Sequence, residues 1–246
     1  MKKWTQASSV LSLLLIWYLV YLIIDHPILM PSILETTKSL FGLLVEKEVL
    51  LSITTTFLRL MVSVGFSFLL SLILSFLSYK FKLVETFMNP YMVLFKTVPL
   101  VSVILILYVL VHFRVAPYII TMLMIVPIFY QVFLSGLKGI DQTYIDIYLL
   151  EDDKTNTSIK YLYYPLIKPY IIIGLLQAVG LGIKVLVMAE FITQSRSGIG
   201  RLIYDAKINL DYATIYAITI LLIVVAYLIE RLIKRYENHE RNWAHS

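Results

Sequence analysis

Long apolar blocks constrain the fold of this chain more than any other feature. A helix needs about 20 mostly apolar residues to cross the hydrocarbon core of a bilayer. Blocks of this kind recur along the chain, and only 15% of its 246 residues are charged, against about 25% in a typical soluble domain. We predict an all-α integral membrane protein with one transmembrane domain over residues 1–246. About six spans are expected, at residues 9–24, 52–78, 91–111, 117–137, 170–192 and 213–229.

The distribution of Lys and Arg between the connecting segments predicts the orientation. Cytoplasmic segments are enriched in these residues. One set of flanks holds twelve of them and the opposite set holds six. The first set is Lys2, Lys3, Lys80, Lys82, Lys138, Lys154, Lys160, Lys168, Arg231, Lys234, Arg235 and Arg241, and the second is Lys38, Lys47, Arg114, Arg196, Arg201 and Lys207. We expect a multi-pass protein of the cell membrane with both termini in the cytoplasm.

A polar segment separates the fourth and fifth spans. Residues 144–165 read YIDIYLLEDDKTNTSIKYLYYP. Asp141 can cap a short helix that carries Ile145, Tyr148 and Leu149, and EDDKTN is rich in turn-forming residues. A second short helix would end near Pro165. Two short helices around a turn, projecting from a membrane bundle into the cytoplasm, indicate a surface that holds a partner protein.

Two other classes of membrane protein were weighed against a partner-driven transporter. A membrane-embedded enzyme needs clustered acid, base or metal-binding groups, but the four histidines have no metal-site spacing; they are His26, His112, His239 and His245. A secondary transporter often shows internal repeats, and none is convincing here. Both classes stay open as alternatives. The chain has no Gly-x-x-x-x-Gly-Lys-Ser/Thr phosphate loop, so we expect no ATP hydrolysis by the chain itself.

Four charged residues fall inside the spans or at their rims, where a centred charge costs about 2.5–3.5 kcal/mol. They are Arg59, Lys96, Lys184 and Glu190. Arg59 and Glu190 lie near the outer ends of their spans, so we expect each to reach water on its own. Lys96 can do the same from the inner part of the third span.

Lys184 lies near the middle of the fifth span and is harder to solvate. Gln177 precedes it by seven residues, which places both on one helical face, about 20° apart. Gly180 lies between them and Met188 extends the row. These four residues are predicted to line a translocation path. The alternative is that Lys184 pairs with a carboxylate or a carbonyl inside the bundle.

Small residues recur at helical spacing in two spans. Ser63, Ser67, Ser71 and Ser75 form one row in the second span, and Gly174, Ala178 and Gly182 form another in the fifth. Small residues at this spacing let helices approach closely. We expect both rows to pack against neighbouring helices.

Two outer segments have helical patterns without the length of a span. PSILETTKSLFGLL has Ser32 three residues before Glu35, which is a capping-box pattern. SGIGRLIYDAKINL is opened by a turn at Gly198 and Gly200. Both are expected to lie flat on the outer surface. In the second segment, Arg201 and Asp205 are four residues apart and can pair with each other.

The order of several motifs resembles the permease subunit of binding-protein-dependent ABC importers, which have the type I importer fold. LMPSILETTKSL is similar to the Leu-Pro-Ser-Pro-x-Glu opening of the family. The second span, TTTFLRLMVSVGFSFLLSL, the third, LFKTVPLVSVILIL, and the segment AEFITQSRSGIGRLIYDAK after the fifth are also similar. The branch that it resembles handles sulfonates, taurine, nitrate and thiamine-precursor pyrimidines. The polar segment stands where the family has its Glu-Ala-Ala loop, but here Asp146-Ile147-Tyr148 replaces that triplet and Asp152 replaces the usual Gly.

The resemblance implies a set of partners. Two permease copies, expected as a homodimer, would pair with two copies of a separate ATPase that uses ATP, while the permease itself is non-catalytic and binds no cofactor or metal. An extracellular binding protein would deliver a small polar or anionic solute, and Arg201 and Asp205 are expected to help receive it. No nucleic acid is expected. The coupling loop, about 141–161, would contact the ATPase through Ile145, Asp146, Tyr148, Leu149, Glu151 and Asp152.

Overall fold

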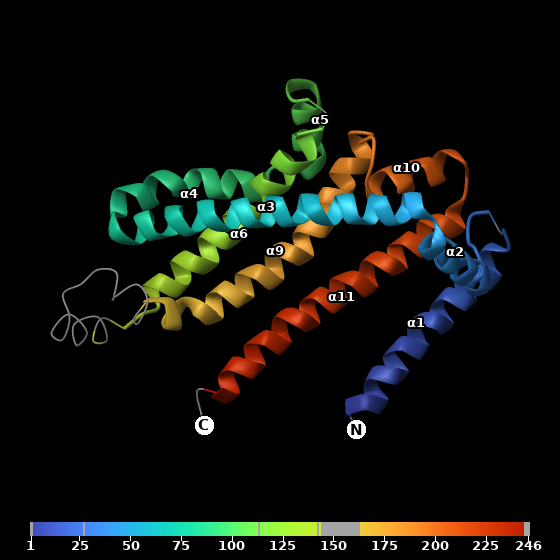
Figure 1. Cartoon of the computed structure of the whole chain (residues 1–246), viewed down its shortest axis with the longest axis horizontal. Helices are drawn as coiled ribbons and strands as arrows, with labels where there is room; N and C mark the ends of the chain where they lie inside the picture. The colour runs from blue at the N-terminus through green and yellow to red at the C-terminus, as the bar shows by residue number, and fades with distance from the viewer. Residues whose placement is uncertain (1, 27, 113, 142, 144–162, 244–246) are drawn as a thin grey trace.

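The computed structural model of the chain describes residues 2–26, 28–112, 114–141, 143 and 163–243 (Figure 1). Every regular element in these ranges is an α-helix. The helices are α1 (Lys2–Ile24), α2 (Ile33–Val45), α3 (Lys47–Lys80), α4 (Lys82–Thr97), α5 (Leu100–Leu110), α6 (Ala116–Lys138), α9 (Tyr164–Ile192), α10 (Ile199–Ile208) and α11 (Tyr212–Trp243). The predicted all-helical fold is therefore confirmed for this part of the chain.

Four described helices, α3, α6, α9 and α11, are long and apolar enough to cross a membrane. The helices α4 and α5 reach this standard only together, which gives up to five spans. The apolar helix Ser8–Ile24 within α1 is shorter than these spans. The predicted total of six spans is not confirmed.

The third predicted span is not one straight helix. A break after α4 bends the chain by 100° before α5 begins. Pro99 stands at this break, as the residue before the first turn of α5. A proline has no N–H to donate and disfavours the helical conformation of the residue before it. The expectation of one span over 91–111 was wrong in this respect.

The centre of the bundle is formed by α3, α6 and α9. The four serines of the predicted row in α3, Ser63, Ser67, Ser71 and Ser75, are fully buried. Ser71 donates a hydrogen bond to the backbone oxygen of Val126 in α6 (3.0 Å). Large aromatic side chains of α6, including Phe129 and Phe133, fill the space between α6 and its neighbours. The prediction that the serine row packs against another helix is confirmed.

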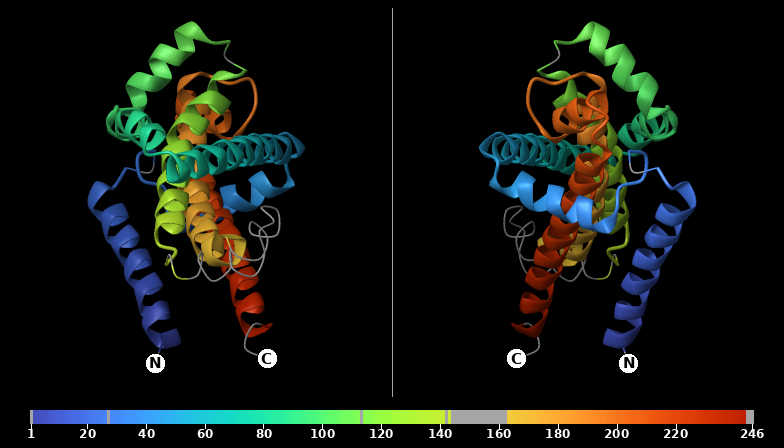
Figure 2. Two further views of the ribbon diagram at one scale, coloured as in Figure 1. Left: turned by 90° about the vertical axis from the view of Figure 1, so that its left-hand side faces the viewer. Right: turned by 90° about the vertical axis from the view of Figure 1, so that its right-hand side faces the viewer.

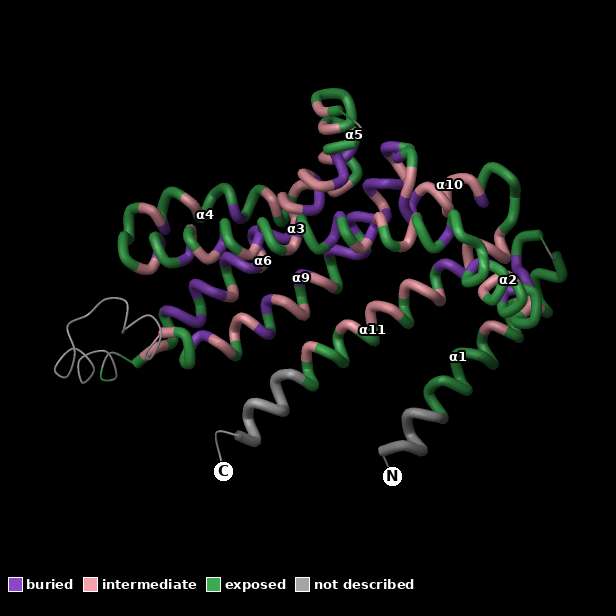
Figure 3. The backbone as a smooth tube through the Cα atoms, in the orientation of Figure 1, coloured by how far each residue is buried: buried purple, intermediate pink, exposed green. Residues whose placement is uncertain are grey.

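The helices α1 and α11 lie at the edge of this centre. Most large apolar side chains of α1 are exposed (Figure 3), as expected for a helix that meets lipid. Trp17 holds α1 in place because its indole N–H donates to the backbone oxygen of Pro31 (3.2 Å). The same ring lies 5.3 Å from that of Tyr216 in α11.

The two ends of the bundle carry different elements. One end, here called the α10 end, holds α10 and the connection between α5 and α6, whereas α2 lies lower than α10 (Figures 1 and 2). Both ends of the described chain lie away from it, at the lower edge of Figures 1 and 2, and the last turn of α6 and the first turn of α9 also lie lower than α10. The helix α2 begins with the predicted capping box, since Ser32 and Glu35 bond to each other's backbone N–H groups.

Candidate functional site

The candidate site is built on α9, which has one tightly packed side. Ala178 is fully buried. A side chain in place of Gly182 would lie 2.9 Å from both Ile125 of α6 and Leu60 of α3, and one in place of Gly174 would lie 3.1 Å from Phe129. These separations leave no room for a larger residue. The predicted row of small residues is therefore the contact between α9 and the bundle centre.

Gln177, Gly180 and Lys184 are all exposed on the single chain. Within the part of the chain that the structure describes, Lys184 has no hydrogen bond or ion pair. The alternative of a partner inside the bundle is therefore not observed there. Gln177 and Lys184 are left together on a face that no described helix covers.

The other two predicted path residues, Gly180 and Met188, have neighbours from other helices of the same chain. Gly180 borders a small pocket of about 50 Å³ between α9 and α11, beside Ala226 and Glu230. Met188 is half-buried and packs on the cluster that contains Ile104 and Ile120. The structure brings Gln177 and Lys184 together, but it gives Gly180 and Met188 neighbours within the same chain.

The sequence predicts that Arg59 and Glu190 each reach water separately. In the structure these two charges at the α10 end are paired instead. Glu190 is 0% exposed and Arg59 is 9% exposed. Arg59 Nη1 lies 2.7 Å from Glu190 Oε1. The expectation that each side chain reaches water on its own was wrong, because the two helices bring opposite charges to the same depth and pairing removes the need for water.

Lys96 was also expected to reach water. Its side chain is exposed, but it donates a hydrogen bond to the Gln131 amide oxygen on α6. That prediction therefore missed a partner in the neighbouring helix.

The Glu190 carboxylate is further enclosed by hydrogen-bond donors. Thr56 Oγ1 donates to it (2.9 Å to Oε2), and the backbone N–H of Gly200 donates to Oε2 (3.0 Å). The Thr56 oxygen in turn accepts the N–H of Ile199 (2.8 Å). Burying a charge costs several kcal/mol unless hydrogen bonds and an opposite charge compensate. We call Thr56, Arg59, Glu190 and Gly200 the Glu190 cluster.

The predicted glycine turn makes this cluster possible. Gly198 has a φ of 115°, a conformation that favours glycine. A Cβ on Gly198 would lie 2.5 Å from the Glu190 carboxylate, and one on Gly200 would lie 2.4 Å from the Val187 backbone oxygen. The sequence did contain a signal for this cluster. Arg59 and Glu190 have opposite charges and the same expected depth in their spans, and Gly198 and Gly200 follow Glu190.

Arg201 and Asp205, the predicted docking residues, lie on α10. Arg201 Nε donates to Asp205 Oδ2 (2.8 Å), so the i,i+4 pairing is confirmed. The Arg201 guanidinium also lies over the Tyr204 ring, 5.5 Å from its centroid. Neither observation tests whether this pair contacts another protein.

The predicted coupling residues lie outside the described residues. They are Ile145, Asp146, Tyr148, Leu149, Glu151 and Asp152. At the edge of that segment, Asp141 Oδ1 accepts the N–H of Thr143 (2.9 Å). This bond lowers the Asp141 pKa below its usual value and is the contact expected of a helix cap.

Two contacts tie the flanks of this segment to the bundle. Lys138 at the end of α6 lies 2.6 Å from Glu85 of α4. On the other side, the Tyr163 ring packs edge-on against Phe76 and Tyr79 of α3. The described residues on either side of the polar segment therefore contact α3 and α4.

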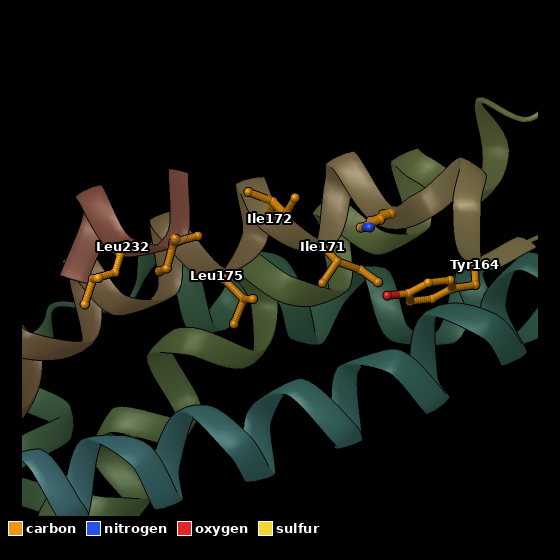
Figure 4. Close-up of a pocket in the computed structure, with 7 residues that line it drawn as sticks. Tyr164, Ile171, Ile172, Leu175 and Leu232 are labelled. Carbon is orange, nitrogen blue, oxygen red and sulfur yellow. The ribbon is translucent and has the colours of Figure 1, made fainter. Parts of the chain in front are cut away.

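A larger pocket, of about 330 Å³, lies between the first turns of α9 and the end of α11 (Figure 4). Its lining is mostly apolar, with Ile171, Leu175 and Leu232 among the lining residues, and its polar members are Tyr164 and Lys168. The lining offers few groups that could orient a polar solute. We therefore do not assign the candidate path to it.

Residues 67–241 match the family of binding-protein-dependent transport system inner membrane components. The chain belongs to this family. Its members are the membrane permease components of ABC importers, which are generally non-catalytic. With its apolar helices, the permease is thus a multi-pass membrane protein. No curated protein gives a significant match to the chain.

Proposed function

We propose that this permease forms the path by which an ABC importer passes a small polar or anionic solute. The observation that carries the proposal is the uncovered face of α9 that presents Gln177 and Lys184. A charge that faces lipid costs about 2.5–3.5 kcal/mol at the centre of a helix. An aqueous path along this face would remove that cost and give Lys184 a role.

The path is completed by a second copy of the chain. The packed side of α9 is occupied by α3 and α6, whereas the exposed Gln177–Lys184 face is available to meet a partner. Most soluble oligomers of identical chains have closed symmetry, and twofold dimers are by far the commonest. Two such faces around one axis would enclose a polar channel. Native mass spectrometry of the purified importer should show two permease copies.

Energy and solute come from other chains. The sequence has no ATP-binding phosphate loop, so a separate ATPase, present in two copies, supplies the energy. The α10 end would face the extracellular binding protein, with Arg201 and Asp205 at the contact, and both termini would be cytoplasmic. Among possible solutes, sulfonates and nitrate fit the positive charge of Lys184, while thiamine-precursor pyrimidines fit the hydrogen-bonding capacity of Gln177.

The coupling loop, about 141–161, would transmit ATPase motion to α9. Ile145, Tyr148 and Leu149 would supply its apolar anchors, because buried aromatic and aliphatic residues carry most interface energy. Asp146, Glu151 and Asp152 would meet basic groups at the rim, where charge guides association.

Reconstitution with the ATPase and the binding protein tests this function. We expect ATP hydrolysis that the loaded binding protein stimulates, and uptake that stops without the ATPase. Tyr148→Asp should release the ATPase or separate hydrolysis from uptake, while Tyr148→Phe, which keeps the aromatic ring, should retain both. Uptake at full rate without an ATPase would rule the proposal out.

A further inference from the structure

Three arginine side chains line one cavity at the α10 end. The cavity has a volume of about 360 Å³. Its lining residues are Arg59, Arg114, Tyr118, Ser195, Arg196 and Ser197. They come from α3, from the beginning of α6 and the residues before it, and from the connection between α9 and α10. Three guanidinium groups and three hydroxyl groups therefore surround one space, and none of the six lining side chains is a carboxylate.

The inner wall of this cavity is held rigidly. Arg59 Nη1 donates to the Ser197 backbone oxygen (2.8 Å) as well as to Glu190, and Nη2 approaches Ser197 Oγ (3.3 Å). Ser195 is 1% exposed, and its N–H donates to the Glu190 backbone oxygen (3.0 Å). The Glu190 cluster thus fixes one wall of the cavity before any ligand arrives. Fixed donors lower the cost of ordering the site on binding.

The outer wall carries the other two arginines, Arg114 and Arg196, which are exposed. Arg196 also lines a second cavity of about 460 Å³, together with His112 and Gln194. A guanidinium has five N–H donors and no acceptor. The lining therefore carries many more donors than acceptors, as a negatively charged oxygen group requires. Arg59 already donates to Glu190 and Ser197. The contacts to such a group would therefore come mainly from Arg114 and Arg196.

We propose that this cavity binds a small oxyanion, of the sulfonate, phosphate or carboxylate type. The planar fork of arginine matches two oxygens of such a group, and the hydroxyl groups of Tyr118 and Ser197 can donate to a third. The inference that an anion binds here depends only on the residues that line the cavity. Its role rests on the proposed function: the site would collect an anionic solute at the α10 end before the solute meets Lys184.

The test uses the full chain in lipid nanodiscs, without ATPase or binding protein, so it does not depend on the proposed function. Methanesulfonate is titrated at constant ionic strength in chloride, and binding is followed by calorimetry. Dimethyl sulfone is the matched uncharged probe because it replaces one charged oxygen with a methyl group. We expect saturable binding of methanesulfonate and none of dimethyl sulfone. Equal binding of both probes, or of neither, would overturn the proposal even if no variant could be purified.

Variants then place the binding in this cavity. Arg114→Gln combined with Arg196→Gln should weaken methanesulfonate binding by at least about tenfold, since each charge-assisted hydrogen bond contributes about that much. Lys207→Gln is the control, because it removes a positive charge from α10 without touching the cavity lining. An equal loss in this control would show a general effect of charge. Arginine variants that weaken only the docking of a binding protein, with anion affinity unchanged, would also contradict the proposed site.

Discussion

Lys184 and Glu190 are two charges on the same apolar helix, yet their surroundings are opposite. Glu190 is fully buried and receives donors from Thr56, Arg59 and Gly200. Lys184 is exposed, and within the described residues it has no hydrogen bond or ion pair. Six residues separate them, so they point about 120° apart around the helix axis. One charge faces the bundle and the other faces away from it.

This difference shows how to interpret a charge in a membrane span. A buried charge with several partners joins elements, and here Glu190 joins α9 to α3 and to the start of α10. An exposed charge such as Lys184, which has no hydrogen bond or ion pair within the described residues, does not join one helix to another. We therefore assign Glu190 to the architecture, whereas the proposed translocation path would give Lys184 its role. The two roles predict different consequences when each charge is removed.

Removal of the buried charge should have the largest effect. Glu190→Ala leaves Arg59 buried without its carboxylate, and loss of one partner from a buried pair costs about 3–5 kcal/mol. We expect a lower free energy of unfolding by about this amount, measured by denaturant titration in detergent micelles.

A double variant sharpens this prediction. Arg59→Met combined with Glu190→Leu removes both charges and keeps apolar volume, so its cost should be smaller than that of Glu190→Ala. If Glu190→Ala unfolds at the wild-type denaturant concentration, the Glu190 cluster does not hold these helices together.

Loss of a neutral partner of Glu190 should have a smaller effect. Thr56→Val removes the donor to the carboxylate and the acceptor of the Ile199 N–H. A buried polar group left unpaired costs about 1–3 kcal/mol. Thr54→Val is the matched control, because Thr54 is exposed and bonds only within its own helix, to Leu50. Equal losses of unfolding free energy in the two variants would contradict the role given to Thr56.

Removal of the exposed charge should leave stability unchanged and reduce uptake. For Lys184→Met we expect a wild-type unfolding transition but, for an anionic solute, uptake at least about tenfold slower, the equivalent of one charge-assisted hydrogen bond. Uptake is measured in proteoliposomes that contain the full importer. Normal uptake would remove Lys184 from the path. A loss of stability as large as that of Glu190→Ala would place Lys184 among the structural charges.

The smallest effect concerns a carboxylate at the surface, Glu35 in α2. Hydrogen bonds from the Ser32 backbone N–H and hydroxyl lower the Glu35 pKa below its ordinary value of 4.5. The capping contribution is therefore present above 4.5 and is lost as pH falls through the lower folded-state pKa. Protection of the first-turn amides of α2 against hydrogen exchange, measured relative to the intrinsic exchange rate at each pH, should fall over that range. Glu35→Gln keeps an acceptor that does not titrate, so an unchanged pH dependence in this variant would refute the assignment.

The sequence was sufficient for four long spans and for much of their packing. The apolar blocks gave α3, α6, α9 and α11, and the spacing of small residues gave the contacts of the α3 serines and of Gly182. These patterns are local or periodic, so one segment at a time reveals them. The capping box at Ser32 and the turn at Gly198 were found for the same reason.

The missed features depend on two segments at once. Arg59 and Glu190 were considered singly, and nothing local to either span shows that the other charge lies beside it. The bend at Pro99 was missed because a proline inside a span can also be accommodated without a break. The arginine cavity draws residues from three separate parts of the chain. Such features follow from how the helices are arranged, which periodicity alone does not determine.

Thiol labelling of α9 can show whether Gln177 and Lys184 face water, since the chain contains no cysteine. Single cysteines are placed at Gln177 and Lys184, and at the adjacent buried positions Ala178 and Val185. The assembled importer is treated during ATP turnover with a charged, membrane-impermeant thiol reagent. The account predicts modification at 177 and 184 but not at 178 and 185. If 177 and 184 react only with a lipid-soluble reagent, as a cysteine in place of Leu13 on the exposed face of α1 should, that face of α9 meets lipid and the account is contradicted.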